Sequence, residues 1–115
     1  HNSNPAIFGV KIEGGKVKEN TKVMDGNGKE IGTIKKVQSD KKAVDEAGMG
    51  MEVALSVTGV TFDRQLENEE FLYSNLSAGQ FREFKKNKDL LSPDEIDVLQ
   101  KIAQIKRKAD PTWGV

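Results

Sequence analysis

The feature of the sequence that most constrains its fold is a change of hydrophobic period at Leu76. Before this residue, glycine turns separate short runs rich in β-branched residues, and the run from Val53 to Val57 alternates apolar with small or polar residues. After it, apolar residues recur every three or four positions. A period of two predicts strands and a period of about 3.6 predicts helices. We therefore expect a mainly β fold with an α appendage: strands within residues 3–76, and two helices with a tail in residues 77–115, packed together as one structural domain.

The residues before Leu76 predict short strands joined by tight turns. The clearest runs are Pro5–Ile12, Thr21–Met24, Glu30–Ser39, Met51–Gly59 and Phe71–Asn75. The DGNG run at Asp25 is the strongest hairpin signal, because these residues tolerate positive φ angles. In the third run, regular alternation places on one face Ile31, Thr33, Lys35 and Val37, and on the other Gly32, Ile34 and Lys36. Apolar residues on both faces predict a small closed antiparallel β-barrel, with Gly32 at a bend or close approach.

Both expected helices have well-marked starts. Each begins with a capping box, formed by Ser77 with Gln80 and by Ser92 with Glu95. Pro93 suits the first position of the second helix, because it lacks the N–H that would be unpaired there. We expect the first helix to reach about Lys88 and the second to end before Asp110 and its following proline. The short connection between them predicts a helical hairpin.

The second helix carries an apolar stripe wider than a single packed seam requires. Its members are Ile96, Val98, Leu99, Ile102, Ala103, Ile105 and Ala109. One side of the stripe is expected to face the strands, and the rest is covered either by a partner or by the first helix and Trp113. Trp113 is accordingly either an anchor for a partner or a residue that packs back on the helices. The sequence leaves both alternatives open.

The residue types present exclude most catalytic chemistry. The chain has no cysteine, and its one histidine is His1, which together with Asn2 we regard as a vector-derived remnant. Triads that use a histidine base and zinc sites therefore lack their usual groups. Gly14-Gly15-Lys16 lacks the remainder of a phosphate-binding loop and is interpreted as a turn. We expect no catalytic residue, no metal site and no membrane-spanning segment, and the absence of cysteine fits a cytoplasmic protein.

Charge allows a local basic surface but not a generally basic protein. The chain has 18 Lys and Arg and 18 Asp and Glu, for a formal net charge of +0. Cations that could form a phosphate-contacting face on the strands are Lys35, Lys36, Lys41, Lys42 and Arg64. Lysines on strands also serve to protect sheet edges and to keep a protein soluble. Taken alone, these residues indicate a binding module or a structural domain.

The order of the segments resembles a known family. Residues 5–38 resemble the barrel segment of translational GTPases, the domain II type, and KKAVDEAGMGMEVALSVTG at 41–59 continues that pattern. DRQLENEEFLYS at 63–74 resembles its last strand, although Asp63 stands where glycine is usual and Glu69-Glu70 replace Gly-Asp. With SPDEIDVLQKIAQIKRKADPTWG at 92–114, the chain resembles the C-terminal domain, domain IV, of translation initiation factor 5B, homologue of bacterial initiation factor two. The ending IKRKADPTWG is similar to the archaeal form.

The resemblance implies a non-catalytic module of a larger factor. The full-length factor would be a ribosome-dependent GTPase whose GTP and Mg²⁺ bind in another domain, so this chain needs no cofactor. Implied partners of a monomeric domain IV are the acceptor end of initiator methionyl-tRNA, initiation factor 1A and the ribosomal subunits. Arg64 and Gln65 match the family's R-Q pair and are the first candidates for tRNA binding, followed by Lys35 and Lys36. Helix geometry gives as candidates for a partner groove Phe81, Phe84, Ile102, Ile105, Lys106 and Arg107. The alternative is a purely structural domain that positions the factor on the ribosome without a ligand of its own.

Overall fold

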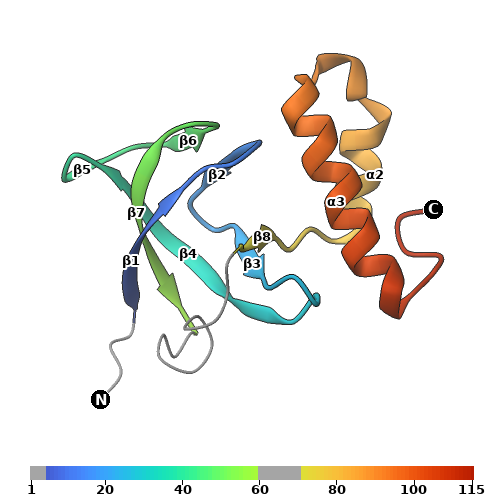
Figure 1. Cartoon of the computed structure of the whole chain (residues 1–115), viewed down its shortest axis with the longest axis horizontal. Coiled ribbons are helices and arrows are strands. Elements are labelled where there is room, and N and C mark those ends of the chain that lie inside the picture. The colour runs from blue at the N-terminus through green and yellow to red at the C-terminus, as the bar shows by residue number, and fades with distance from the viewer. Residues whose placement is uncertain (1–4, 60–70) are drawn as a thin grey trace.

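The computed structural model of the chain describes residues 5–59 and 71–115, and Figure 1 shows their arrangement. The strands are β1 (Ala6–Lys11), β2 (Lys16–Lys18), β3 (Lys22–Met24), β4 (Glu30–Ser39), β5 (Lys42–Ala43), β6 (Glu46–Gly48), β7 (Glu52–Thr58) and β8 (Tyr73–Ser74). The helices are α2 (Ala78–Lys86), the 3₁₀ turn η1 (Lys88–Leu90) and α3 (Pro93–Ala109). The prediction of a mainly β fold followed by two helices is confirmed.

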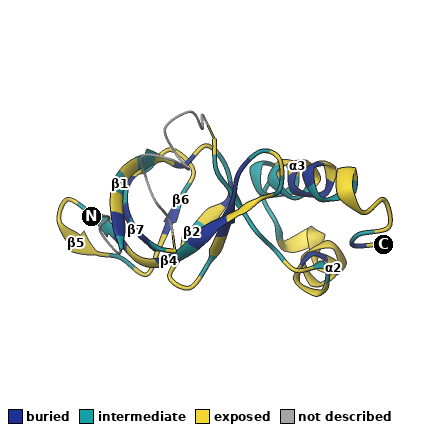
Figure 2. Cartoon of the chain, turned by 90° about the horizontal axis from the view of Figure 1, so that it is seen from below, coloured by how far each residue is buried: buried dark blue, intermediate teal, exposed yellow. Residues whose placement is uncertain are grey.

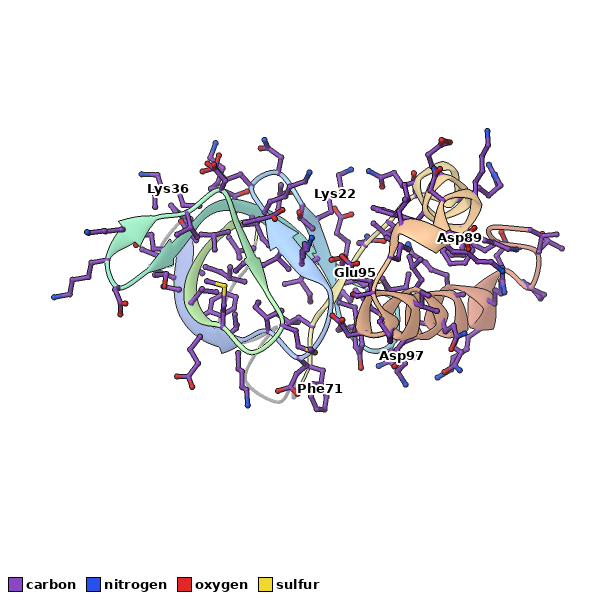
Figure 3. The ribbon with its side chains drawn as sticks, turned by 90° about the horizontal axis from the view of Figure 1, so that it is seen from above. Lys22, Lys36, Phe71, Asp89, Glu95 and Asp97 are labelled. Atoms are coloured by element: carbon purple, nitrogen blue, oxygen red, sulfur yellow. The ribbon has the colours of Figure 1, made fainter. Side chains whose placement is uncertain are left out.

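The strands form an open antiparallel sheet and a separate ribbon. The sheet has the order β1-β7-β4-β3-β8, with β5 added beside β4, and β2 pairs only with β6. Within the described residues the hydrogen-bonded path ends at β1 and at β8, so the predicted closed barrel is not confirmed. The strands still curve around a shared set of inward side chains (Figure 3). β8 has two residues and β2 has three, so these strands form too few backbone hydrogen bonds to continue the pairing around that core and close the barrel.

A bulge in β4 changes which residues face inward. The pairing of β4 with β7 shifts register between Ile34 and Lys36. Ile34 and Val37 are both fully buried although they lie three positions apart, which a regular strand does not permit. The predicted placement of Lys35 and Val37 on one face is therefore wrong. As a result of the bulge, Lys35 and Lys36 are both exposed, side by side along the chain.

Two apolar cores hold the molecule together. The larger lies inside the curved sheet and contains Ile31, Ile34, Val37, Val53, Leu55 and Val57. The smaller consists of Met24 from β3 and Ile102 and Ile105 from α3, with Tyr73 and Trp113 packed against it. Each fully buried side chain of this size contributes about 1.5–3 kcal/mol through the hydrophobic effect. One side of the apolar stripe on α3 therefore faces the strands, as predicted.

A second contact joins α3 to the turn between β1 and β2. The Gly15 N–H donates to Oδ2 of Asp94 at 2.9 Å, and Nζ of Lys16 lies 3.8 Å from Oε2 of Glu95. A Cβ added at Gly14 would lie 3.0 Å from a methyl group of Val98, so the turn packs closely on the helix. The first turn of α3 is thereby fixed to the sheet.

The helix starts are confirmed, and the end of α2 differs slightly. The Ser77 N–H donates to Gln80 at 2.9 Å, and the Ser92 N–H donates to Glu95 at 2.9 Å. α2 ends at Lys86, two residues before the predicted Lys88, because Asn87 closes the helix and η1 begins as a separate turn.

Candidate functional site

The outer face of the sheet carries two rows of residues set by strand register. Ser56 of β7 lies opposite Ile7 of β1 and Lys36 of β4. In the next row, Ala54 lies opposite Gly9 and Gln38. Small side chains thus occupy the central strand, with larger ones on both sides. This arrangement makes a shallow trough along β7.

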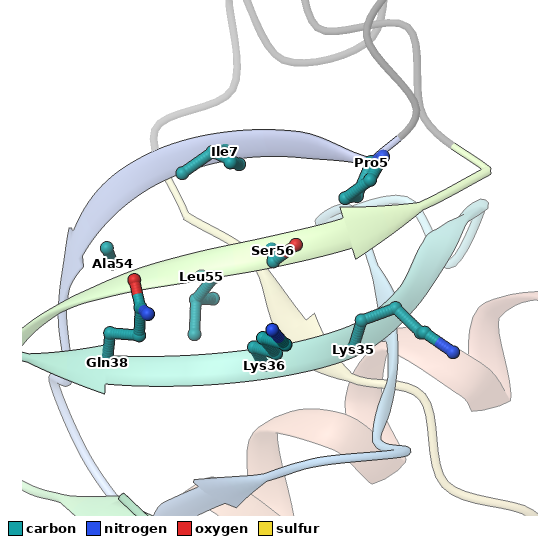
Figure 4. A pocket seen from close by; sticks show the side chains of 8 residues that line it. All are labelled: Pro5, Ile7, Lys35, Lys36, Gln38, Ala54, Leu55 and Ser56. Carbon is teal, nitrogen blue, oxygen red and sulfur yellow. The ribbon is translucent and has the colours of Figure 1, made fainter. Parts of the chain in front are cut away.

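We call this trough the outer groove. It has a volume of about 380 Å³ and is lined by Pro5, Ile7, Lys35, Lys36, Gln38, Ala54, Leu55 and Ser56. Figure 4 shows Ile7 and Pro5 on the β1 side and the β4 side chains across β7 from them. Ile7 is 69% exposed, an unusual degree of exposure for an isoleucine. The groove therefore has an apolar wall, a floor of small residues and a cationic wall.

The cationic wall is produced by the bulge in β4. Lys35 and Lys36 are adjacent in sequence, and in a regular strand one of them would point inward. In residues 5–59 and 71–115, neither lysine lies within ion-pair distance of a carboxylate. Two neighbouring ammonium groups next to an apolar wall suit a ligand with a phosphate beside a planar or apolar group.

The β4–β5 turn carries two further lysines. Ser39 pairs with Lys42, so Asp40 and Lys41 form a two-residue turn, with φ angles of 52° and 67°. Positive φ at both positions is typical of the primed turns that match strand twist. Lys41 and Lys42 are exposed, but Lys42 lies opposite Ser39, three strand residues or roughly 10 Å beyond Lys36 along β4, and neither lysine lines the groove. They lie beyond the outer groove.

Arg64 and Gln65, the first candidates for tRNA binding, lie outside the described residues. The other two candidates, Lys35 and Lys36, both line the outer groove.

The chain's own tail covers part of the predicted partner groove. Phe81 is the buried residue of α2, and its ring lies 4.9 Å from that of Trp113, tilted by 49°. Ile102 and Ile105 are buried in the smaller core. Phe84, in contrast, is 43% exposed. Of the two alternatives for Trp113, the structure has it packed back on the helices.

Two cations of α3 hold the tail in place. Nε of Arg107 donates to the backbone oxygen of Trp113 at 2.7 Å, and its guanidinium lies 5.5 Å from the centre of the Phe81 ring. Nζ of Lys106 lies 5.8 Å from the centre of the Trp113 ring. Such cation–π contacts add to the packing of the rings. Both candidate cations are thus engaged within the chain and only partly exposed.

The groove residues that sequence reasoning missed are Pro5, Ile7, Gln38, Ala54, Leu55 and Ser56. Alternation within β7 already placed Ala54 and Ser56 on the face opposite its buried valines and leucine. The missing information was the register with β1 and β4, which depends on the bulge.

Two other kinds of site are not found among residues 5–59 and 71–115. No group of three or more His, Cys, Asp or Glu side chains is placed to hold a metal ion there. None of the helices in those ranges has the length and apolar character needed to cross a bilayer.

The comparisons with known proteins identify this curved β domain and its capped helical hairpin as a domain of a translation factor. The chain belongs to the family of elongation factor Tu domain 4, whose family model matches residues 1–73. It is 39% identical over 114 residues to a probable translation initiation factor IF-2 of Methanopyrus kandleri, covering 98% of this chain and 19% of that protein. A probable IF-2 of Methanoculleus marisnigri is 38% identical over 113 residues, which are 97% of this chain and 19% of that protein.

A solved structure matches over the same extent. The crystal structure of GDP-bound aIF5B from Aeropyrum pernix superimposes with a TM-score of 0.91 and 36% identity, covering 98% of this chain and 19% of that one. The chain thus spans about a fifth of the length of these relatives. The matches agree with the resemblance to domain IV at the C-terminal end of the archaeal factor, and the helical hairpin is included in them.

Proposed function

We propose that the chain is the C-terminal module of an archaeal-type translation initiation factor and binds the acceptor end of initiator methionyl-tRNA in the outer groove. The observation that carries the proposal is an exposed apolar wall at Ile7 that faces Lys35 and Lys36 across a floor of small residues, with neither lysine paired to a carboxylate in the described part of the chain. Unpaired nucleotides bind proteins by packing a base on an apolar surface and placing phosphates near cations. Arg64 and Gln65 belong to this proposal through their match to the family's R-Q pair.

The surrounding factor supplies the context of this proposal. The full-length protein would be a GTPase of the cytoplasm that acts when the ribosomal subunits join, with GTP and Mg²⁺ in another domain. The GDP bound to the relative from Aeropyrum pernix supports the nucleotide requirement. This module would contribute binding and no catalysis.

Initiation factor 1A is the second proposed partner. Its acidic and apolar C-terminal tail would contact the surface formed by Phe84 and the exposed parts of Lys106 and Arg107. Phe81, Ile102 and Ile105 are covered by Trp113 and the sheet. A partner would reach them only by displacing the tail of this chain.

The tRNA proposal is tested by titrating the isotope-labelled chain with an initiator acceptor minihelix that carries methionine. We expect shifts of amide signals in β1, β4 and β7, and a reduction of affinity of about tenfold in Lys35→Ala/Lys36→Ala. The matched control is Lys18→Ala/Lys29→Ala, which removes the same charge at exposed positions away from the groove. Equal weakening in both variants would reduce the effect to net charge and refute the assignment.

A purely structural role is the alternative function. The packing of Phe81 on Trp113 favours it, because the tail closes part of the surface expected for a partner. This role predicts no shifts with either the minihelix or a peptide of the factor 1A tail at low salt.

A further inference from the structure

The C-terminal half of α2 and the η1 turn that follows it are exposed throughout. Every residue from Arg82 to Leu90 is exposed, and Phe81 is the one buried residue of α2 (Figure 2). Most helices on a globular surface bury a continuous apolar stripe. α2 therefore presents nearly all of its circumference to solvent.

Cations are concentrated on one side of this exposed helix. Lys85 and Lys86 lie three and four residues after Arg82, so each of their side chains neighbours that of Arg82 on one side of the helix. Like charges at this spacing destabilise a helix, although the helix dipole at its C-terminal end offsets part of that cost. Within the described residues, none of the three lies within ion-pair distance of a carboxylate. We call these three residues the α2 cationic face.

We propose that the α2 cationic face binds the sugar-phosphate backbone of double-helical RNA. Three cations on one side of a helix, none of them paired with a carboxylate of residues 5–59 and 71–115, can each replace a counterion on a phosphate. The face carries no aromatic residue, because Phe84 lies on the opposite side of the helix. A single strand held by base stacking would need such a residue, which favours a duplex read by its backbone.

Other anionic partners fit this face less well. A peptide that is both acidic and apolar would need apolar groups beside the cations, but the exposed apolar side chains of this arm are Phe84, on the opposite side of α2, and Leu90, in η1. A membrane surface would need an apolar helix face to insert, but Phe81 of α2 is covered by Trp113.

This surface is separate from the outer groove. In Figure 1, α2 lies with α3 at one end of the molecule, and the strands β1 and β7, which line the groove, lie at the other end. The choice of RNA as the nucleic acid rests on the proposed role in translation. The two proposals use different residues, so either can fail without the other.

The test measures binding of the 115-residue chain to a blunt-ended RNA duplex without an unpaired 3′ end, by fluorescence anisotropy over a range of salt concentrations. We expect Arg82→Gln/Lys85→Gln/Lys86→Gln to weaken binding by about tenfold or more. The slope of log K against log salt should fall by roughly 0.9 for each phosphate that is no longer neutralised. Glutamine is a good helix former, so α2 is expected to persist, which circular dichroism checks.

Two comparisons make the result specific. Lys11→Gln/Lys18→Gln/Lys29→Gln removes the same charge from exposed positions on the strand side and is expected to leave duplex binding within about twofold. Lys35→Ala/Lys36→Ala is expected to retain duplex binding while binding the acceptor minihelix more weakly. Equal weakening of duplex binding in the two triple variants overturns the proposal. The proposal is also overturned if Arg82→Gln/Lys85→Gln/Lys86→Gln still binds the duplex but no longer binds an acidic, isoleucine-containing peptide. That result would assign the face to a protein partner.

Discussion

Gly32 shows how a single residue determines the close pairing of β4 with β7. A Cβ added there would lie 2.1 Å from the backbone oxygen of Thr58 and 2.9 Å from a methyl group of Val57. The backbone oxygen cannot rotate away, so any larger residue must push the two strands apart. The same strand pair carries the bulge that exposes Lys35 and Lys36.

Replacing Gly32 with alanine is expected to destabilise the protein by about 1–3 kcal/mol, the usual cost of forcing extra atoms into a packed site. Urea unfolding measures the change. Gly9→Ala is the matched control, because its added Cβ would meet its nearest atom at 4.0 Å, an ordinary contact. We expect that control to stay within about 0.5 kcal/mol of the parent protein. A Gly32→Ala protein as stable as the control would show that the strands can separate at no cost.

At the scale of elements, local signals in the sequence predicted the helices better than the sheet. Serine caps act within one turn of chain, so the starts of α2 and α3 follow from the sequence alone. Strand pairing depends on residues far apart. The ribbon of β2 with β6 and the bulge in β4 are therefore not visible in any single run of residues. The candidate lysines were predicted, but the outer groove that they line required that register.

The contact between the first turn of α3 and the turn that joins β1 to β2 depends on pH. Hydrogen bonds from the Ser92 hydroxyl, and next from the Gly15 N–H, lower the pKa of Asp94 from its ordinary 3.8. The Ser92 N–H, followed by its hydroxyl, likewise lowers the pKa of Glu95 from 4.5. A carboxylate with a lowered pKa in the folded state binds fewer protons there than in the unfolded chain. Its stabilisation is therefore present above the ordinary pKa and is lost as the pH falls through the lowered one.

Asp94→Asn is accordingly expected to reduce the loss of folding stability at low pH. Chemical unfolding at a series of pH values should show the parent losing stability as the pH falls from about 5, with a smaller loss in the variant. Asp97→Asn is the control, since Asp97 is an exposed residue of the same helix and no hydrogen bond joins it to the described part of the sheet. If Asp94→Asn and the parent lose stability in parallel below about pH 5, the link to Gly15 does not act through the charge of Asp94.

For the whole molecule, the two cores differ in size and in what they join. The larger core lies within the sheet, whereas the smaller joins α3 to β3 through three buried residues, with Tyr73 of β8 packed against them. The chain measures 41 × 28 × 20 Å, with the sheet and the hairpin at opposite ends of its long axis (Figure 1). Regions with few buried apolar contacts open at lower free energy than the rest of a protein. We therefore expect the hairpin to open while the sheet remains folded.

Native-state hydrogen exchange of two matched substitutions tests this order of opening. Ile34→Ala in the larger core and Ile102→Ala in the smaller core should each cost about 2–5 kcal/mol, since both isoleucines are buried. Ile34→Ala destabilises the native state and the hairpin-open state equally, so it should lower the protection of β4 and β7 amides and leave α2 and α3 unchanged. Ile102→Ala destabilises only the native state, and should lower the protection of both regions. Equal reduction of helix protection in the two variants would instead mean that the sheet and the hairpin unfold as one unit.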